Sequence, residues 1–258
     1  MLDVTTDSQA LGIRLRVQEG ASSFDLDRFI CDLLELFEGA ACLDLGCGRG
    51  KQSLPLAKAI GNRGKLLSID YSPESVAFLS AELDRIGLSD RVEVVEKHLD
   101  DVSEAVKGRA FDRVVGSYSL YYCSHPDVLL STIRSVMKPD ARLVFCGPRH
   151  ENNFELRNLI AQAGGKNDAN LATASSQFMV DIAPPICRHL FDEVSVSPFN
   201  NRVVFKSAAD LSLYWKSHAL FDAAIEEEFD RLAQRHFALN DSFVNTKGGV
   251  GVSAMAAA

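Results

Sequence analysis

The segment LDLGCGRG, residues 43–50, is the strongest local signal in the chain for a strand, a turn and a helix. The apolar residues 41–45 lead into glycines at positions 46, 48 and 50, and residues 51–60 follow with helical spacing of apolar side chains. Glycines at alternate positions let the backbone turn sharply and approach a ligand closely. A loop that feeds a helix N-terminus also offers free N–H groups. The segment therefore predicts a ligand-binding turn between a strand and a helix.

The alternation of strand and helix continues to about residue 148. Ser72-Pro73-Glu74 is typical of a helix start, with serine at the N-cap and proline at the first position. Strands that alternate with helices predict a parallel sheet covered on both faces, which is a doubly wound α/β fold. In such folds ligands bind at the carboxyl ends of the strands. The elements predicted are strands at 65–69, 91–96, 111–117 and 141–146, and helices at 73–86 and 128–137.

Two carboxylates at these strand ends indicate the kind of cofactor. Asp70 ends the second strand, where an acid accepts hydrogen bonds from two ribose hydroxyls. Asp44 stands two residues before the first glycine, where it would repel a pyrophosphate and attract an ammonium or sulfonium group. Lys51 occupies the position at which a dinucleotide fingerprint needs its third glycine. These features favour S-adenosylmethionine over NAD, with an NAD-dependent oxidoreductase as the less favoured alternative.

Four segments in this order resemble the class I S-adenosylmethionine-dependent methyltransferases. The closest likeness is to the small-molecule group that includes the ubiquinone and menaquinone biosynthetic enzymes. Besides LDLGCGRG, the segments are IDYSPESV (69–76), FDRVVGSYSLYY (111–122) and VMKPDARLVF (136–145). The resemblance covers roughly residues 37–148. It implies a Rossmann-like seven-stranded sheet, with five parallel strands, an antiparallel edge pair, helices on both faces and a helical lid.

The resemblance also implies which residues contact the methionine part of the cofactor. The glycine loop would lie along it, the acid before the loop near its amino group, and the residues after the fourth strand near the sulfonium. These residues are Asp44, Gly46, Cys47, Gly48, Ser117 and Tyr118.

For the nucleoside, the resemblance assigns the ribose to Asp70 and places Tyr71 against the adenine. After the third strand the family often has an Asp-Ala pair that contacts adenine, and this chain has His98 and Leu99 there instead. Either the histidine contacts adenine, or one of the aspartates at 100 and 101 reaches the site after a small shift. The sequence leaves both alternatives open.

Candidate residues for the acceptor follow the fourth and fifth strands. Methyl transfer from a sulfonium is an in-line displacement, so the protein supplies positioning and excludes water, and a general base is needed only for an acceptor that must lose a proton. Tyr121 and His150 are the candidate catalytic residues, and Arg149 is the candidate for holding an anionic group of the acceptor. Trp215 is a candidate lining residue of the lid. No metal site is expected, because no His/Cys set has zinc-site spacing.

The remaining segments predict the closing part of one domain. A helix is expected at 153–163 and two short helices within 177–190, on either side of Pro184-Pro185. Strands are expected at 191–199 and 247–254. We expect a single methyltransferase domain over residues 1–258, in which the core spans 37–150, an N-terminal cap spans 8–36, and a helical insertion spans 207–237 between the last two strands.

Composition excludes several classes of protein. The 258 residues include 27 Lys plus Arg and 35 Asp plus Glu, a net charge of −8, whereas nucleic-acid binding needs clustered cations. No apolar run reaches the ~18 residues of a membrane span, and the N-terminal residues do not resemble a secretory signal. Six cysteines without a CxxC pair indicate a reduced, cytoplasmic protein. We expect a small-molecule methyl acceptor, leave a homodimer open, and keep a non-catalytic S-adenosylmethionine-binding protein as the alternative.

Overall fold

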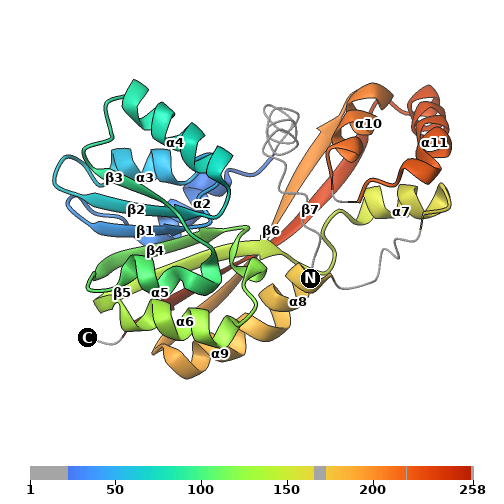
Figure 1. The fold of residues 1–258 in the computed structure, drawn as a ribbon. Coiled ribbons are helices and arrows are strands. Elements are labelled where there is room, and N and C mark those ends of the chain that lie inside the picture. Colours follow the sequence, from blue (N-terminus) through green and yellow to red (C-terminus); the bar gives the residue numbers. More distant parts are fainter. Residues whose placement is uncertain (1–22, 166–172, 219, 257–258) are drawn as a thin grey trace. The chain divides into compact units, whose positions relative to one another are not determined.

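The computed structural model describes residues 23–165, 173–218 and 220–256 (Figure 1). Its sheet has seven strands in the order β3-β2-β1-β4-β5-β7-β6. Strands β1 to β5 pair in parallel, and an antiparallel pair completes the edge, as predicted. The strands are β1 (Ala41–Leu45), β2 (Lys65–Asp70), β3 (Val92–Glu96), β4 (Phe111–Ser117), β5 (Met137–Pro148), β6 (Glu193–Phe205) and β7 (Phe243–Met255).

Helices cover both faces of the parallel strands, which confirms the doubly wound α/β fold (Figure 1). One face carries α2 (Leu26–Leu34), α3 (Ser53–Ala59) and α4 (Pro73–Arg85), and the other carries α5 (Val102–Val106), α6 (Pro126–Ser135) and α9 (Ala183–Leu190). Leu43, Leu45 and Ile69 are wholly buried between these layers. Parallel strands covered on both sides bury nearly every side chain, so their sequences are apolar runs.

The start of α4 forms as the sequence predicts. Ser72 is the N-cap, and its hydroxyl accepts a hydrogen bond from the Ser75 N–H at 3.2 Å. Pro73 takes the first helical position, where its missing N–H would have no partner in any case. This cap fixes the direction in which the chain leaves β2, directly after Asp70.

Strand β5 begins earlier than predicted. The sequence predicts a strand at 141–146 after a helix at 128–137, but the extended strand already starts at Met137 and includes residues 138–140. Phe111 pairs with Met137 while Arg113 pairs with Arg142, so β5 carries extra residues against β4 in a bulge. Asp140 accommodates the bulge with φ +57, a left-handed conformation that aspartate tolerates better than most residues.

The prolines at 184 and 185 begin a helix rather than separate two helices. The break in the segment falls earlier, at a π-helical turn, Phe178–Ile182, between α8 (Ala174–Gln177) and α9. Proline is favoured in a first helical turn because its ring fixes φ and no N–H is required there. The expected pair of short helices is therefore wrong, because α8, the π-helical turn and α9 follow one another without a gap from Ala174 to Leu190.

Strands β6 and β7 are longer than the predicted 191–199 and 247–254. In β6, the asparagines at 200 and 201 interrupt the apolar alternation that marked the strand. Helices α10 (Ala208–Lys216) and α11 (Glu226–Leu239), with a 3-10 turn at Ala223–Ile225, lie between the two strands in the chain, as expected. Their role as a lid stays a prediction, and residues 8–22 of the proposed cap lie outside the described residues.

The chain divides into two compact units. Among the described residues, unit 1 contains 23–25, 150–165, 173, 199–218 and 220–249, and it includes α7 (Phe154–Gln162), α10 and α11. Unit 2 contains Leu26–Arg149, Ala174–Pro198 and Val250–Ala258. Strands β6 and β7 contribute residues to both units. The glycine loop and the ends of β1 to β4 belong to unit 2, so the candidate site can be described within that unit.

Candidate functional site

The glycine loop is anchored to the end of the neighbouring strand. The backbone N–H groups of Gly46 and Cys47 both donate to the Ile69 carbonyl, at 2.7 and 3.0 Å. Gly46 has φ +70, and a Cβ added there would lie 2.3 Å from the Cβ of Ser119. A side chain at this position would therefore face both a strained backbone and a steric clash. The loop provides a surface of bare backbone, as expected for close approach of a ligand.

Ser119 is a site residue that the sequence analysis missed. Its hydroxyl donates to the Leu45 carbonyl at 2.5 Å, which ties the loop after β4 to the last residue of β1. Tyr118, immediately before it, has φ +56, a left-handed backbone that is uncommon outside glycine. Strained residues of this kind cluster at functional sites. The adjacent strand ends are thus held together at the predicted position.

Asp70 fixes the glycine loop from the end of β2. One carboxylate oxygen accepts the Gly48 N–H at 2.7 Å, and the other accepts the Ser72 N–H at 3.0 Å. Each carboxylate oxygen has a second lone pair, so these bonds leave acceptor capacity for hydroxyl groups of a ligand. The ribose-binding role of Asp70 stays a prediction, and the structure adds a loop-positioning role.

Replacing Asp70 with alanine is expected to weaken S-adenosylmethionine binding by about 1–3 kcal/mol, because the Gly48 and Ser72 N–H groups lose their acceptor. Titration calorimetry on wild type and variant measures the difference. The exposed Asp90, at the opposite end of the sheet, gives the matched control Asp90→Ala, which should bind as wild type. Equal affinity of Asp70→Ala and wild type would refute the assignment.

Asp44 lies beneath the loop, with only 1% of its surface exposed. Its carboxyl accepts a hydrogen bond from the Ser53 hydroxyl at 2.6 Å. Burial, with a smaller contribution from the Asp70 carboxylate, raises the pKa of Asp44 from 3.8 to about 7, although the Ser53 bond acts in the opposite direction. Burial likewise raises the pKa of the Cys47 thiol, which favours the neutral thiol.

The predicted adenine-contacting residues follow β2 (Tyr71) and β3 (His98, Leu99). The rings of Tyr71 and His98 face each other edge to face, with centroids 5.9 Å apart. The Nδ1 atom of His98 accepts the Asp100 N–H at 3.3 Å and lies 3.5 Å from the Asp100 carboxylate. Leu99 is 7% exposed and belongs to the hydrophobic core. The two alternatives for contacting adenine were His98 and one of the aspartates at 100 and 101. In the structure His98 and Asp100 contact each other.

The residues that follow β4 form a packed aromatic group. The Ser117 hydroxyl lies 3.5 Å from the Cys146 sulfur. Tyr121 packs edge to face on Tyr122 and Phe178, at centroid distances of 4.7 and 6.4 Å. Burial, followed by the neighbouring tyrosines, raises the pKa of Tyr121 well above 10, so its phenol keeps its proton at neutral pH. This environment suits a hydrogen-bond donor better than a general base.

The prediction that Trp215 lines an acceptor site does not fit the structure. Its side chain is wholly buried in unit 1, stacked on Phe229 at a centroid distance of 3.9 Å. Its indole N–H donates to the Leu220 carbonyl at 3.0 Å, so its one donor is satisfied. An amphipathic aromatic residue with this packing stabilises the helical insertion. Arg149 and His150 follow β5 directly, and they belong to unit 2 and unit 1 respectively, so their roles stay predictions.

A second missed contact joins α2 to the segment after the glycine loop. The Gln52 side-chain amide donates to Asp27 at 2.8 Å, and the Lys51 ammonium lies 3.8 Å from the same carboxylate. Arg49, within the loop, stacks over the Phe78 ring of α4 at 3.6 Å. These contacts hold the loop on the side of α2 and α4. They join residues at least 24 positions apart, so no local sequence pattern marked them.

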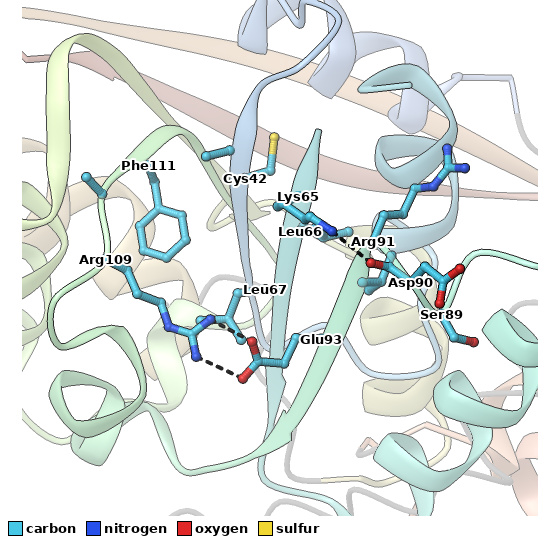
Figure 2. A pocket seen from close by; sticks show the side chains of 13 residues that line it. Cys42, Lys65, Leu66, Leu67, Ser89, Asp90, Arg91, Glu93, Arg109 and Phe111 are labelled. Atoms are coloured by element: carbon cyan, nitrogen blue, oxygen red, sulfur yellow. Dashed lines mark hydrogen bonds and ion pairs between the residues drawn. The ribbon is translucent and has the colours of Figure 1, made fainter. Parts of the chain in front are cut away.

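A cavity of about 490 Å³ lies at the amino ends of strands β1 to β4, at the opposite end from the glycine loop (Figure 2). Its lining includes the first residues of β1 and β2 and the loop that precedes β4. Figure 2 shows an ion pair on its rim, in which Arg109 donates to Glu93 at 2.7 and 2.8 Å, and a hydrogen bond from the Lys65 ammonium to the Asp90 carbonyl at 2.8 Å. The cavity is thus separate from the glycine loop, which follows the carboxyl end of β1.

The doubly wound sheet, the bare glycine loop and the acids at the ends of β1 and β2 define a Rossmann-like protein that binds a nucleoside cofactor. A family model described as a methyltransferase domain matches residues 36–189, which is more than half of the chain, and the chain belongs to this family.

Individual relatives agree with this assignment. Aklanonic acid methyltransferase DauC of Streptomyces sp. (strain C5) is 28% identical over 123 residues, which is 48% of this chain and 54% of the relative. Nocamycin O-methyltransferase of Saccharothrix syringae is 30% identical over 122 residues, or 47% and 42%. The chain spans about half the length of these curated relatives. The YcgJ structure from Bacillus subtilis has a TM-score of 0.61 at 13% identity over 90% of this chain and 98% of that one, a likeness of fold.

S-adenosylmethionine is the cofactor of this family, and the residues present fit it. The cradle at Gly46 admits no Cβ, so a ligand there contacts bare backbone. Asp44 places a buried carboxyl next to the loop, which suits a cation and opposes a pyrophosphate. Asp70, on the neighbouring strand, keeps acceptor capacity for ribose hydroxyls.

Proposed function

We propose that the protein transfers a methyl group from S-adenosylmethionine to a small-molecule acceptor, at an oxygen, nitrogen or carbon atom, in the biosynthesis of a metabolite. The observation that carries the proposal is the Gly46 cradle with acids on two neighbouring strands. The named activities of the similar proteins support a small acceptor, because aklanonic acid and nocamycin are small molecules. The net charge of −8 supports an acceptor other than nucleic acid.

The bound cofactor supplies an activated methyl group, so this chain has to position the acceptor and exclude water. Tyr118, directly after β4, is proposed to place its ring near the sulfonium, where a cation–π contact is favourable. Tyr121 keeps its proton, so its hydroxyl would donate a hydrogen bond. His150 is the proposed general base for an acceptor that must be deprotonated, and Arg149 is proposed to hold an anionic group of it.

Titration calorimetry with S-adenosylmethionine, S-adenosylhomocysteine and NAD tests the cofactor. We expect the first two to bind and NAD not to bind, and binding of NAD alone would refute the proposal. Incubation with methyl-labelled cofactor and a cell extract, followed by identification of the labelled product, tests the transfer. Cofactor binding without any labelled product from a broad acceptor panel would favour a non-catalytic S-adenosylmethionine-binding protein.

Two substitutions separate the candidate catalytic residues. If His150 is the base, His150→Gln should lower kcat about 100-fold or more without changing the cofactor Kd, as removal of a general base does. Tyr121→Phe should change kcat less, because the phenol is not ionised at neutral pH. Steady-state kinetics with the identified acceptor measure both. A larger loss in Tyr121→Phe than in His150→Gln would reverse the assignment.

The cellular setting is also proposed rather than observed. In the part of the chain that the structure describes, no helix is long and apolar enough to cross a membrane. Within the same residues, no three His, Cys, Asp or Glu side chains are grouped as a metal site. We propose a cytoplasmic enzyme that acts on a diffusible acceptor. Sedimentation of the purified chain tests whether it forms a homodimer.

A further inference from the structure

A buried chain of hydroxyl groups ends on the Asp44 carboxyl. The Ser68 hydroxyl, on β2, donates to the Ser53 hydroxyl at 3.0 Å, and the Ser53 hydroxyl donates to Asp44 at 2.6 Å. All three side chains are at most 1% exposed. Ser53 begins α3 directly after the glycine loop, so this chain connects the base of the loop to the neighbouring strand. Each hydroxyl has a defined direction of donation, which holds the carboxyl in one orientation.

This carboxyl lacks a cation. Among residues 23–165, 173–218 and 220–256, no Lys, Arg or His forms an ion pair with it, although a buried carboxylate normally requires such a partner. The groups that surround Asp44 add no positive charge, and β4 places the apolar Val115 beside it in register. Its titratable and polar neighbours are Cys42 on the same strand, Cys47 in the loop, Ser53 on α3, and Ser68 and Asp70 on β2.

We propose that Ser53, held by Ser68, is a positioning residue that makes the Asp44 carboxyl a proton-linked receptor for the cationic end of the cofactor. The inference rests on the proposed binding of S-adenosylmethionine. In the free protein at pH 6 the carboxyl carries a proton, and when the ligand cation arrives its O–H bond breaks. The proton leaves to solvent, and the electron pair stays on the carboxylate that now faces the cation. Charge balances, because one cation replaces one proton in the buried site.

The expected size of this proton release follows from the raised pKa of Asp44, about 7 in the free protein. Binding should release about 0.9 proton per site at pH 6, about 0.5 at pH 7 and about 0.1 at pH 8. The ligand's own α-amino group, with an ordinary pKa of about 7.7–8.0, is already protonated at pH 6. Release measured at pH 6 therefore comes from the protein.

Titration calorimetry in pairs of buffers with different ionisation enthalpies measures the released protons directly, independently of catalysis. In the wild type we expect the binding heat to depend on the buffer at pH 6, and this dependence to fade by pH 8. Wild type that binds S-adenosylmethionine with the same heat in every buffer at pH 6 would overturn the inference and leave the proposed function intact. Absence of S-adenosylmethionine binding would instead overturn the proposed function.

Substitutions test whether the released proton comes from Asp44 and whether Ser53 sets the pKa of Asp44. Asp44→Asn should abolish the release and weaken binding about tenfold or more, since a buried cation then lacks its counter-charge. Ser53→Ala removes a bond that lowers the pKa of Asp44, so the pH at half-maximal release should rise, with near-isosteric Ser53→Cys intermediate. Ser135→Ala, at the exposed end of α6, is the matched control. Unchanged release in Asp44→Asn, or an unmoved midpoint in a folded Ser53→Ala, would contradict the proposal.

Discussion

Gly46→Ala is expected to lose detectable S-adenosylmethionine binding, a fall in affinity of about 100-fold or more. Alanine at φ +70 costs roughly 1–2 kcal/mol in backbone energy, and its Cβ would lie 2.3 Å from the Cβ of Ser119. Ser119 would have to move and release the Leu45 carbonyl, or the loop would have to move into the space proposed for the cofactor. Overpacking of this kind adds about 1–3 kcal/mol. Titration calorimetry measures the affinity.

A matched glycine separates the clash from the backbone cost. Gly87 also has φ +70, but a Cβ there would meet nothing within 4 Å. Gly87→Ala should therefore lower stability slightly and leave cofactor affinity unchanged. The double variant Gly46→Ala/Ser119→Gly removes the obstructing side chain and should recover part of the lost affinity, as expected for a coupled pair. Wild-type affinity in Gly46→Ala would show that the loop does not approach the ligand.

The sequence predicted the parallel half of the fold because local signals there agree with the tertiary structure. Apolar runs bounded by glycine identify β1 and β2, and the Ser72-Pro73 cap identifies α4. The predicted strand at 141–146 is shorter than β5 because Pro139 and Asp140 are typical of turns, whereas in the structure they form a bulge. The bulge depends on pairing with β4, which no local pattern shows.

The sequence identified the glycine loop and the two acids as a candidate site, but not the hydrogen bonds that hold them. Glycines and acids at strand ends identify the loop, Asp44 and Asp70 because glycine and aspartate are both depleted in β-strands. Ser119 was missed because its partner, the Leu45 carbonyl, lies 74 positions away. Trp215 was misassigned because a single aromatic residue on a helix gives no information on whether it contacts a ligand or, as here, Phe229.

Asp44→Asn is expected to change the pH dependence of stability of the cofactor-free protein. The pKa of Asp44 is about 7 in the folded chain and 3.8 as the reference for the unfolded chain, so the native state binds the extra proton between these values. Stability must then fall as pH rises through that range. Between pH 5 and pH 8 the wild type should lose roughly 2–3 kcal/mol of unfolding free energy that the variant retains.

Urea denaturation at pH 5, 6, 7 and 8 measures this difference. The exposed Asp90 gives the control Asp90→Asn, whose stability should follow the wild-type curve at every pH. Parallel curves for Asp44→Asn and wild type would show that the carboxyl ionises normally in the folded chain. The buried acid thus lowers the stability of the free protein at neutral pH, and the variant that removes this penalty is expected to bind the cationic cofactor less tightly. Asp44 lowers the stability of the free protein because its negative charge is buried, with no cationic partner among the described residues, until the cationic cofactor binds.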